Sequence, residues 1–187
     1  MIAWLPTLLA KGTEPLQAAH LRYRPQLAAP ARLHMIVLDT SGSMRQRGRL
    51  ALAKGHAARL IEQAAQAGDQ VALLSFGGQG VELLLAPRRA RAASTLRVRT
   101  VGGGGGTPLA QALSEAERLL TQALRRHGPT ETWLWLLTDG RTLEQPTAPR
   151  AARHVVLIDF DSAAQPLGRC AAWAARWGAA YQRALAT

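Results

Sequence analysis

Two apolar segments that each end in an aspartate constrain the fold of this chain more than any other feature. They are "LHMIVLD" (33–39) and "ETWLWLLTDG" (131–140). Continuous apolar runs of this length are typical of central parallel strands that are buried on both faces. In doubly wound sheets, ligands bind at the carboxyl ends of the strands. Asp39 and Asp139 therefore predict a polar site at one edge of an α/β sheet.

Further strands and helices alternate along the chain. Similar apolar runs predict strands at 70–76, 81–87, 153–160 and 179–185. Helical spacing and stop signals predict helices at 48–68, 91–99, 107–126 and 166–178. The turn "GGQG" before 81–87 predicts a hairpin into an antiparallel edge strand that ends at Pro87. We expect a doubly wound, mostly parallel six-stranded sheet flanked by helices, with one antiparallel edge strand.

The first 32 residues differ from the rest. Prolines at positions 6, 15, 25 and 30 interrupt any long element, so an irregular N-terminal arm (1–32) is predicted before a single domain (33–187). The arm carries large apolar side chains that include Trp4 and Tyr23, and such residues mark contacts when they are exposed. We therefore expect the arm to pack along the domain or onto a partner.

A cytoplasmic location is expected from two observations. No basic residue precedes the first apolar run, and no run approaches the ~20 residues of a membrane span. The single cysteine, Cys170, cannot form an internal disulfide and lies in an apolar helical stretch, which favours a reducing compartment and a buried, inert thiol.

Oxygen-bearing side chains gather at the predicted site. They are the carboxylates and hydroxyls of Asp39, Ser41, Ser43, Thr107 and Asp139. An oxygen-only set suits Mg²⁺, Mn²⁺ or Ca²⁺ rather than zinc, and the five histidines show no ligand spacing. Residues i, i+2 and i+4 of an extended segment point the same way, so 39, 41 and 43 are expected to converge on one ion. Thr107 is expected to cap the helix that opens with Pro108.

The segments "DTSGSM", "GGGTPL" and "LLTDGR" resemble the metal-ion-dependent adhesion site of von Willebrand factor A domains. That motif consists of D-x-S-x-S, a distant threonine, and a distant aspartate followed by glycine. The resemblance implies direct ion contacts from Ser41, Ser43 and often Thr107, and contacts through water from Asp39 and Asp139. It also implies that an acidic side chain of a partner completes the ion's shell.

A broader resemblance, over roughly residues 33–185, is to the C-terminal domain of the magnesium chelatase D subunit. "GDQVALLSF", the "ELLLAP" strand and "LLTDGR" carry it. The AAA+ module and acidic linker of that subunit have no counterpart in this sequence. The resemblance implies a non-catalytic accessory subunit that couples a AAA+ ATPase to the large chelatase subunit for Mg²⁺ or Co²⁺ insertion into a tetrapyrrole. Cobaltochelatase and a AAA+ partner outside tetrapyrrole chemistry remain alternatives.

Other functions fit the sequence less well. The loop "GGGGGTP" lacks the lysine of a phosphate-binding loop, which argues against ATP hydrolysis by this chain. An aspartyl-phosphate enzyme would need an acid where Ser41 stands. The net charge of +11 leaves an RNA-associated role open, although the basic residues are scattered without aromatic interleaving, and no membrane partner is expected.

Charged residues near the motif suggest two further roles. Arg45, Arg47 and Arg49 follow it directly and are expected to steer an acidic partner towards the ion. Asp159 and Asp161 lie at the end of the next strand and are expected to cap the following helix, with a supporting role around the ion ligands as the alternative.

Overall fold

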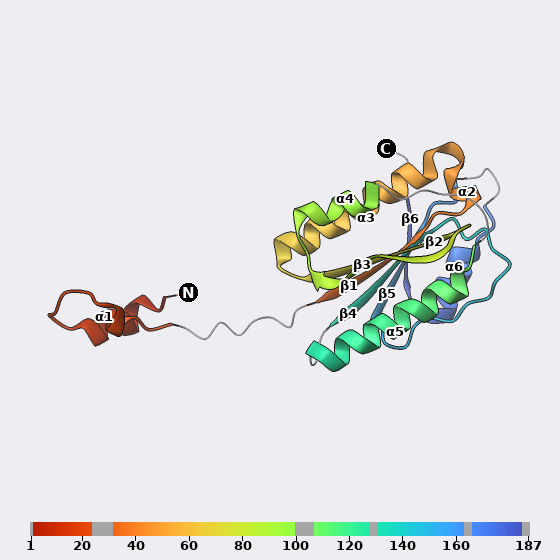
Figure 1. The fold of residues 1–187 in the computed structure, drawn as a ribbon. Coiled ribbons are helices and arrows are strands. Elements are labelled where there is room, and N and C mark those ends of the chain that lie inside the picture. The colour runs from red at the N-terminus through yellow and green to blue at the C-terminus, as the bar shows by residue number, and fades with distance from the viewer. Residues whose placement is uncertain (1, 24–31, 100–106, 128–130, 163–165, 185–187) are drawn as a thin grey trace.

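A six-stranded sheet in the order β3-β2-β1-β4-β5-β6 forms the centre of the domain (Figure 1). The computed structural model describes residues 2–23, 32–99, 107–127, 131–162 and 166–184. The strands are β1 (Leu33–Asp39), β2 (Gln70–Gly77), β3 (Gly80–Arg89), β4 (Thr132–Thr138), β5 (His154–Asp159) and β6 (Ala180–Arg183). The pair β2–β3 is antiparallel and the other four pairs are parallel. The predicted fold class is therefore confirmed.

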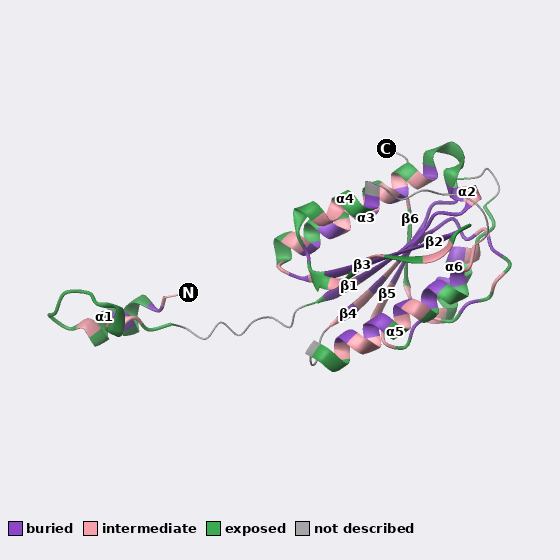
Figure 2. Ribbon diagram, in the orientation of Figure 1, coloured by how far each residue is buried: buried purple, intermediate pink, exposed green. Residues whose placement is uncertain are grey.

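Helices cover both faces of the sheet. On one face lie α3 (Arg49–Ala67) and α4 (Leu96–Arg99), which follows a 3₁₀ turn at Ala92–Thr95, and on the other lie α5 (Leu109–His127) and α6 (Arg169–Trp177) (Figure 1). The four inner strands are largely buried, whereas the edge strands β3 and β6 and the outer sides of the helices are more exposed (Figure 2). This layering places the carboxyl ends of β1 and β4 side by side.

Helix α3 shows how the sequence pattern produces the packing. Its buried apolar residues are Ala53, Ala57, Ile61 and Ala64, spaced three or four apart, so they form one stripe that faces the sheet. Gly68 ends the helix at φ +75°, a left-handed conformation that glycine adopts at little cost.

The edge strand β3 extends beyond its predicted end. It continues through Pro87 to Arg89, with irregular register opposite Val71–Leu74 of β2. Proline has no N–H to donate, but it is tolerated on an edge strand, especially beside a bulge. The predicted end at Pro87 was therefore wrong by two residues.

The N-terminal segment is more regular than predicted. Residues Trp4–Lys11 form helix α1 and Ala18–His20 form a 3₁₀ turn. Pro6 lies in the first turn of α1, where backbone N–H groups have no partner within the helix, so the proline does not prevent it. Six large apolar side chains of this segment are exposed: Trp4, Leu5, Leu8, Leu9, Leu16 and Tyr23. The surface on which they pack stays a prediction.

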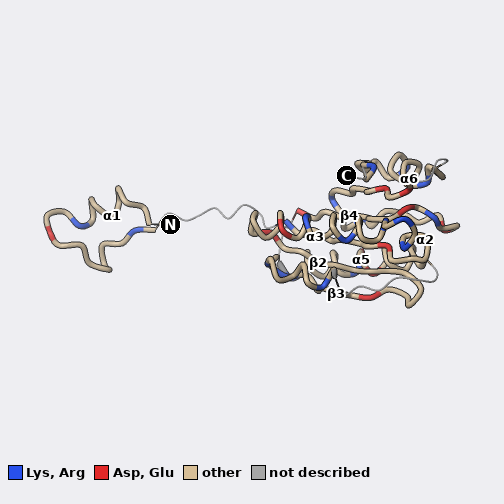
Figure 3. Tube along the Cα trace, turned by 90° about the horizontal axis from the view of Figure 1, so that it is seen from above, with Lys and Arg blue, Asp and Glu red and all other residues tan. Residues whose placement is uncertain are grey.

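Basic and acidic residues are interspersed along the chain, and the basic ones do not gather on a single element (Figure 3). In the part of the chain that the structure describes, no helix combines the length and the apolar character needed to cross a bilayer.

Candidate metal centre

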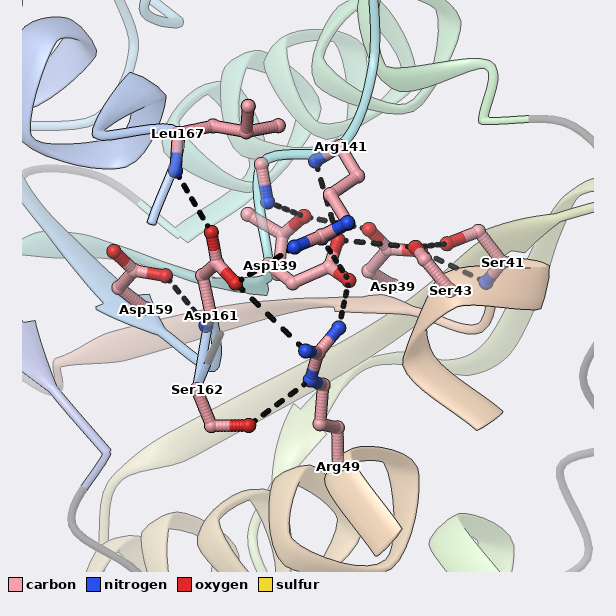
Figure 4. A network of polar contacts seen from close by, with 12 residues as sticks. Asp39, Ser41, Ser43, Arg49, Asp139, Arg141, Asp159, Asp161, Ser162 and Leu167 are labelled. Carbon is pink, nitrogen blue, oxygen red and sulfur yellow. Dashed lines mark hydrogen bonds and ion pairs between the residues drawn. The ribbon is translucent and has the colours of Figure 1, made fainter. Parts of the chain in front are cut away.

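Asp39 and Asp139 lie at the carboxyl ends of neighbouring strands, as predicted, and both are almost fully buried (Figure 4). Asp39 is the last residue of β1, and Asp139 follows the last residue of β4. The hydroxyl of Thr138 donates to Asp39 Oδ2 at 2.5 Å and accepts the N–H of Gly140 at 3.1 Å. Thr138, which the sequence analysis missed, therefore holds the two strand ends together.

The two serines reach the site through a turn. The N–H of Ser41 donates to Asp39 Oδ1 at 2.8 Å, and the short helix α2 (Gly42–Arg45) follows. The hydroxyl oxygens of Ser41 and Ser43 lie 3.1 Å apart, and the Ser43 hydroxyl donates to Asp139 Oδ1 at 3.1 Å. The proximity of these side chains was predicted, but the predicted cause was wrong. The chain turns into a helix after Ser41, so the alternation of side chains along an extended strand does not bring Ser43 to the site.

Thr107 precedes α5, which begins at Leu109 and not at Pro108. The carbonyl of Pro108 accepts the N–H of Ala112 at 3.1 Å, so Pro108 holds the capping position that was predicted for Thr107. Glu144 supplies a side-chain cap, because its Oε2 accepts the N–H of Ala110 at 2.6 Å. Among the described residues no hydrogen bond joins the Thr107 hydroxyl to the other four predicted ligands, so its ligand role stays a prediction.

Two arginines adjoin Asp139, and one of them corrects the steering hypothesis. Arg45 and Arg47 are exposed, but Arg49 is only 5% exposed. Its Nη1 lies 3.0 Å from Asp139 Oδ2 (Figure 4). Arg141 lies on the other side, with Nε 3.8 Å from the same oxygen. The steering prediction therefore no longer includes Arg49, and for Arg45 and Arg47 it stays a prediction.

Asp159 and Asp161 do not cap α6. Its N-cap residue is Gly168, without a side-chain hydrogen bond. Asp159 accepts the N–H of Asp161 at 2.8 Å and the Tyr181 hydroxyl at 2.8 Å. Asp161 accepts the N–H of Leu167 at 3.0 Å and pairs with Arg141 at 3.1 Å. The capping prediction was wrong because the chain runs several residues past the strand before the helix begins.

Asp39 has a distinctive electrostatic environment. Burial raises its pKa to about 6, against the opposing effect of hydrogen bonds from Thr138 and Ser41. In the described part of the chain, no Lys, Arg or His forms an ion pair with Asp39. A buried carboxylate with hydroxyl oxygens on one side and no internal cation suits a hard divalent ion. The donor set thus fits the ion that the sequence predicts.

Cys170 packs beneath this centre, and burial, with the nearby carboxylates of Asp159 and Asp139, raises the pKa of its thiol far above the usual range. Because the thiolate is the reactive form, we expect native protein to resist iodoacetamide at neutral pH and the urea-unfolded protein to react fully. Mass spectrometry of the alkylated protein measures this. Rapid labelling of Cys170 in the folded state would contradict it.

An open α/β sheet with carboxylates and hydroxyls gathered at the carboxyl ends of two adjacent central strands defines the class of this domain. The sequence profile of the von Willebrand factor type A domain matches residues 34–141, more than half of the chain. The chain therefore belongs to the von Willebrand factor A (VWA) family.

Several known proteins are similar to this chain in sequence or in structure. An uncharacterized protein of Mycobacterium tuberculosis is 30% identical over 95% of this chain and 31% of its own length. The magnesium-chelatase 60 kDa subunit of Cereibacter sphaeroides is 43% identical over 59% of this chain and 19% of its own. The chain thus spans less than a third of either relative. The solved structure of BatB from Bacteroides thetaiotaomicron shares the fold, with a TM-score of 0.65 at 18% identity over 82% of this chain and 90% of its own.

Proposed function

We propose that this chain is a metal-dependent protein-interaction domain. Its divalent ion, Mg²⁺ or else Mn²⁺ or Ca²⁺, is held by Asp39, Ser41, Ser43, Thr107 and Asp139. The observation that carries the proposal is Asp39, a buried carboxylate beside two serine hydroxyls and without an ion pair among the described side chains. Hydroxyl ligands carry no formal charge, so an ion held by them keeps much of its positive field and attracts a carboxylate from another molecule.

The partner that we propose is a AAA+ ATPase of a chelatase-type complex, with a large chelatase subunit as a second partner. Support comes from the similarity to magnesium-chelatase subunits over about 110 residues, which is 59% of this chain. In this role the domain supports Mg²⁺ or Co²⁺ insertion into a tetrapyrrole without catalysing it alone. The metal that is inserted is a substrate of the complex and is distinct from the ion held by this domain.

Recruitment of the partner relies on exposed charge near the site. Arg45 and Arg47 lie on the surface just after the two serines. They create a positive field beside the ion, and such a field raises the association rate with an acidic surface more than it raises the final affinity. The ion then supplies the specific contact.

Removal of the ion tests the proposal. We expect a pull-down of the AAA+ subunit and the large chelatase subunit encoded in the same genome to capture at least one of them in Mg²⁺. Capture should fall to background in EDTA and return when excess Mg²⁺ is restored. Circular dichroism in EDTA is the control for folding. Unchanged capture in EDTA would contradict a metal-dependent interaction, and capture of only an unrelated AAA+ ATPase would place the domain outside tetrapyrrole chemistry.

A further inference from the structure

Arg49 is a buried cation whose position the local chain does not explain. It is the first residue of α3, where the helix dipole disfavours positive charge. A buried guanidinium is also costly unless it is paired and hydrogen-bonded. A neutral or acidic residue would stabilise the start of this helix more than arginine does. The contacts that Arg49 makes with other segments must therefore account for it.

The contacts of Arg49 join three segments of the chain. Nη1 lies 3.0 Å from Asp139 Oδ2, and Nη2 lies 3.8 Å from Asp161 Oδ1. Nε donates to the hydroxyl of Ser162 at 3.3 Å. All three nitrogens thus have an oxygen partner, and Figure 4 shows the guanidinium between the ends of β4 and β5. Two hydrogen bonds, a longer ion pair and burial thus hold the guanidinium beside Asp139.

The two carboxylate oxygens of Asp139 therefore have different partners. Oδ2 faces Arg49, with Arg141 at 3.8 Å, whereas Oδ1 accepts the Ser43 hydroxyl at 3.1 Å and the N–H of Arg141 at 3.1 Å. Only Oδ1 is on the side of the two serines. The positive charge beside Oδ2 therefore weakens the attraction of Asp139 for an ion at the serines.

We propose that Arg49 is a positioning residue that limits the affinity of the centre for a free divalent ion, so that tight retention requires a carboxylate from a partner. This inference rests on the proposed function, because it concerns the same ion. Because Asp139 is paired with Arg49, Asp39 is the one carboxylate of the centre that forms no ion pair among the described residues. One carboxylate with hydroxyls is a weak site, and an acidic residue from outside supplies the missing charge.

Substitution of Arg49 by glutamine provides the test. Arg49→Gln removes the charge, and the new side-chain amide can still donate to Asp139, while Asp161 keeps its pair with Arg141 at 3.1 Å. We expect the Kd for Mn²⁺, measured by electron paramagnetic resonance without a partner, to fall about tenfold or more in Arg49→Gln. Arg49→Lys retains the charge and is the matched control, with a Kd close to that of the wild type.

A second variant provides a test in case Arg49→Gln does not fold. Arg141→Gln removes a charge from the same oxygen at a side chain that is 34% exposed, so it should tighten Mn²⁺ binding in the same direction with less effect on stability. Circular dichroism of each protein reports folding. If Arg49→Gln is unfolded, Arg141→Gln decides the outcome.

The possible outcomes separate the two proposals. Tighter Mn²⁺ binding in the glutamine variants, with the lysine variant unchanged, supports the role of Arg49. Unchanged or weaker binding in folded glutamine variants, while the wild type binds, overturns this inference and leaves the proposed function intact. If no folded variant, the wild type included, binds Mn²⁺ even with excess acetate as a carboxylate donor, both proposals fail.

Discussion

Asp39→Asn is expected to abolish ion-dependent partner capture and, in the same protein, to raise the stability of the metal-free domain at neutral pH. Asparagine keeps the size of the side chain and can keep both hydrogen bonds, accepting from the Ser41 N–H and donating to the Thr138 hydroxyl. It loses the negative charge that attracts the ion. Loss of binding and gain of stability therefore have one cause.

The size of the stability effect follows from the pKa of Asp39. Burial raises it from 3.8 to about 6, which costs the native state about 3 kcal/mol above that pH. We expect Asp39→Asn to recover about 1–3 kcal/mol near pH 7, since the amide retains most of the contacts. Urea unfolding in EDTA measures this gain.

The sign of the pH dependence provides a second check. Because the native pKa exceeds that of the unfolded chain, native protein binds more protons between about pH 4 and 6. The contribution of Asp39 to stability therefore decreases as the pH rises through this range and is constant above it. The difference in unfolding free energy between the variant and the wild type should be near zero at about pH 4 and largest at about pH 7.

Asp159→Asn is the matched control for these measurements. Asp159 is also buried at the carboxyl end of a strand, but it bonds to the Asp161 N–H and the Tyr181 hydroxyl and is not a proposed ligand. Its asparagine variant should retain Mg²⁺-dependent capture. The role assigned to Asp39 would be wrong if Asp39→Asn also retained Mg²⁺-dependent capture. It would also be wrong if Asp39→Asn were less stable than the wild type at neutral pH.

Gly140→Ala is expected to destabilise the domain by about 2–4 kcal/mol. Gly140 directly follows Asp139 and has φ +67°, which strains any residue with a Cβ. A Cβ there would lie 2.9 Å from Cys170 Sγ and 3.4 Å from both Arg169 Cβ and Cys170 N. The buried Cys170 side chain, or helix α6 with it, would have to shift to accept the methyl group.

Gly168→Ala separates the two causes of this loss. Gly168 has φ +66°, but a Cβ there would meet no atom within 4 Å. Its substitution should therefore cost only the conformational strain, about 1 kcal/mol. Urea denaturation of both variants in EDTA measures the difference. Equal losses would show that the approach of Cys170 to Gly140 has no energetic consequence.

The sequence by itself determined the fold class and the location of the candidate site. The apolar runs that contain Ile36 and Leu136 predicted central strands, because a strand buried on both faces must be apolar at nearly every position. Alternation of strands and helices then required a doubly wound sheet, and parallel central strands brought Asp39 and Asp139 to the same edge. These conclusions depend only on local patterns and general packing rules.

Only the tertiary structure decided how the site is charged. Arg45, Arg47 and Arg49 look alike in the sequence, yet the first two are exposed and the third is buried against Asp139. Their environments depend on where α3 begins relative to the end of β4, and these segments are 90 residues apart in the chain. The same holds for the hydrogen bond from Thr138 to Asp39. Local patterns predict which elements form, but the contacts between distant elements decide which charged side chains are paired with each other and which are not.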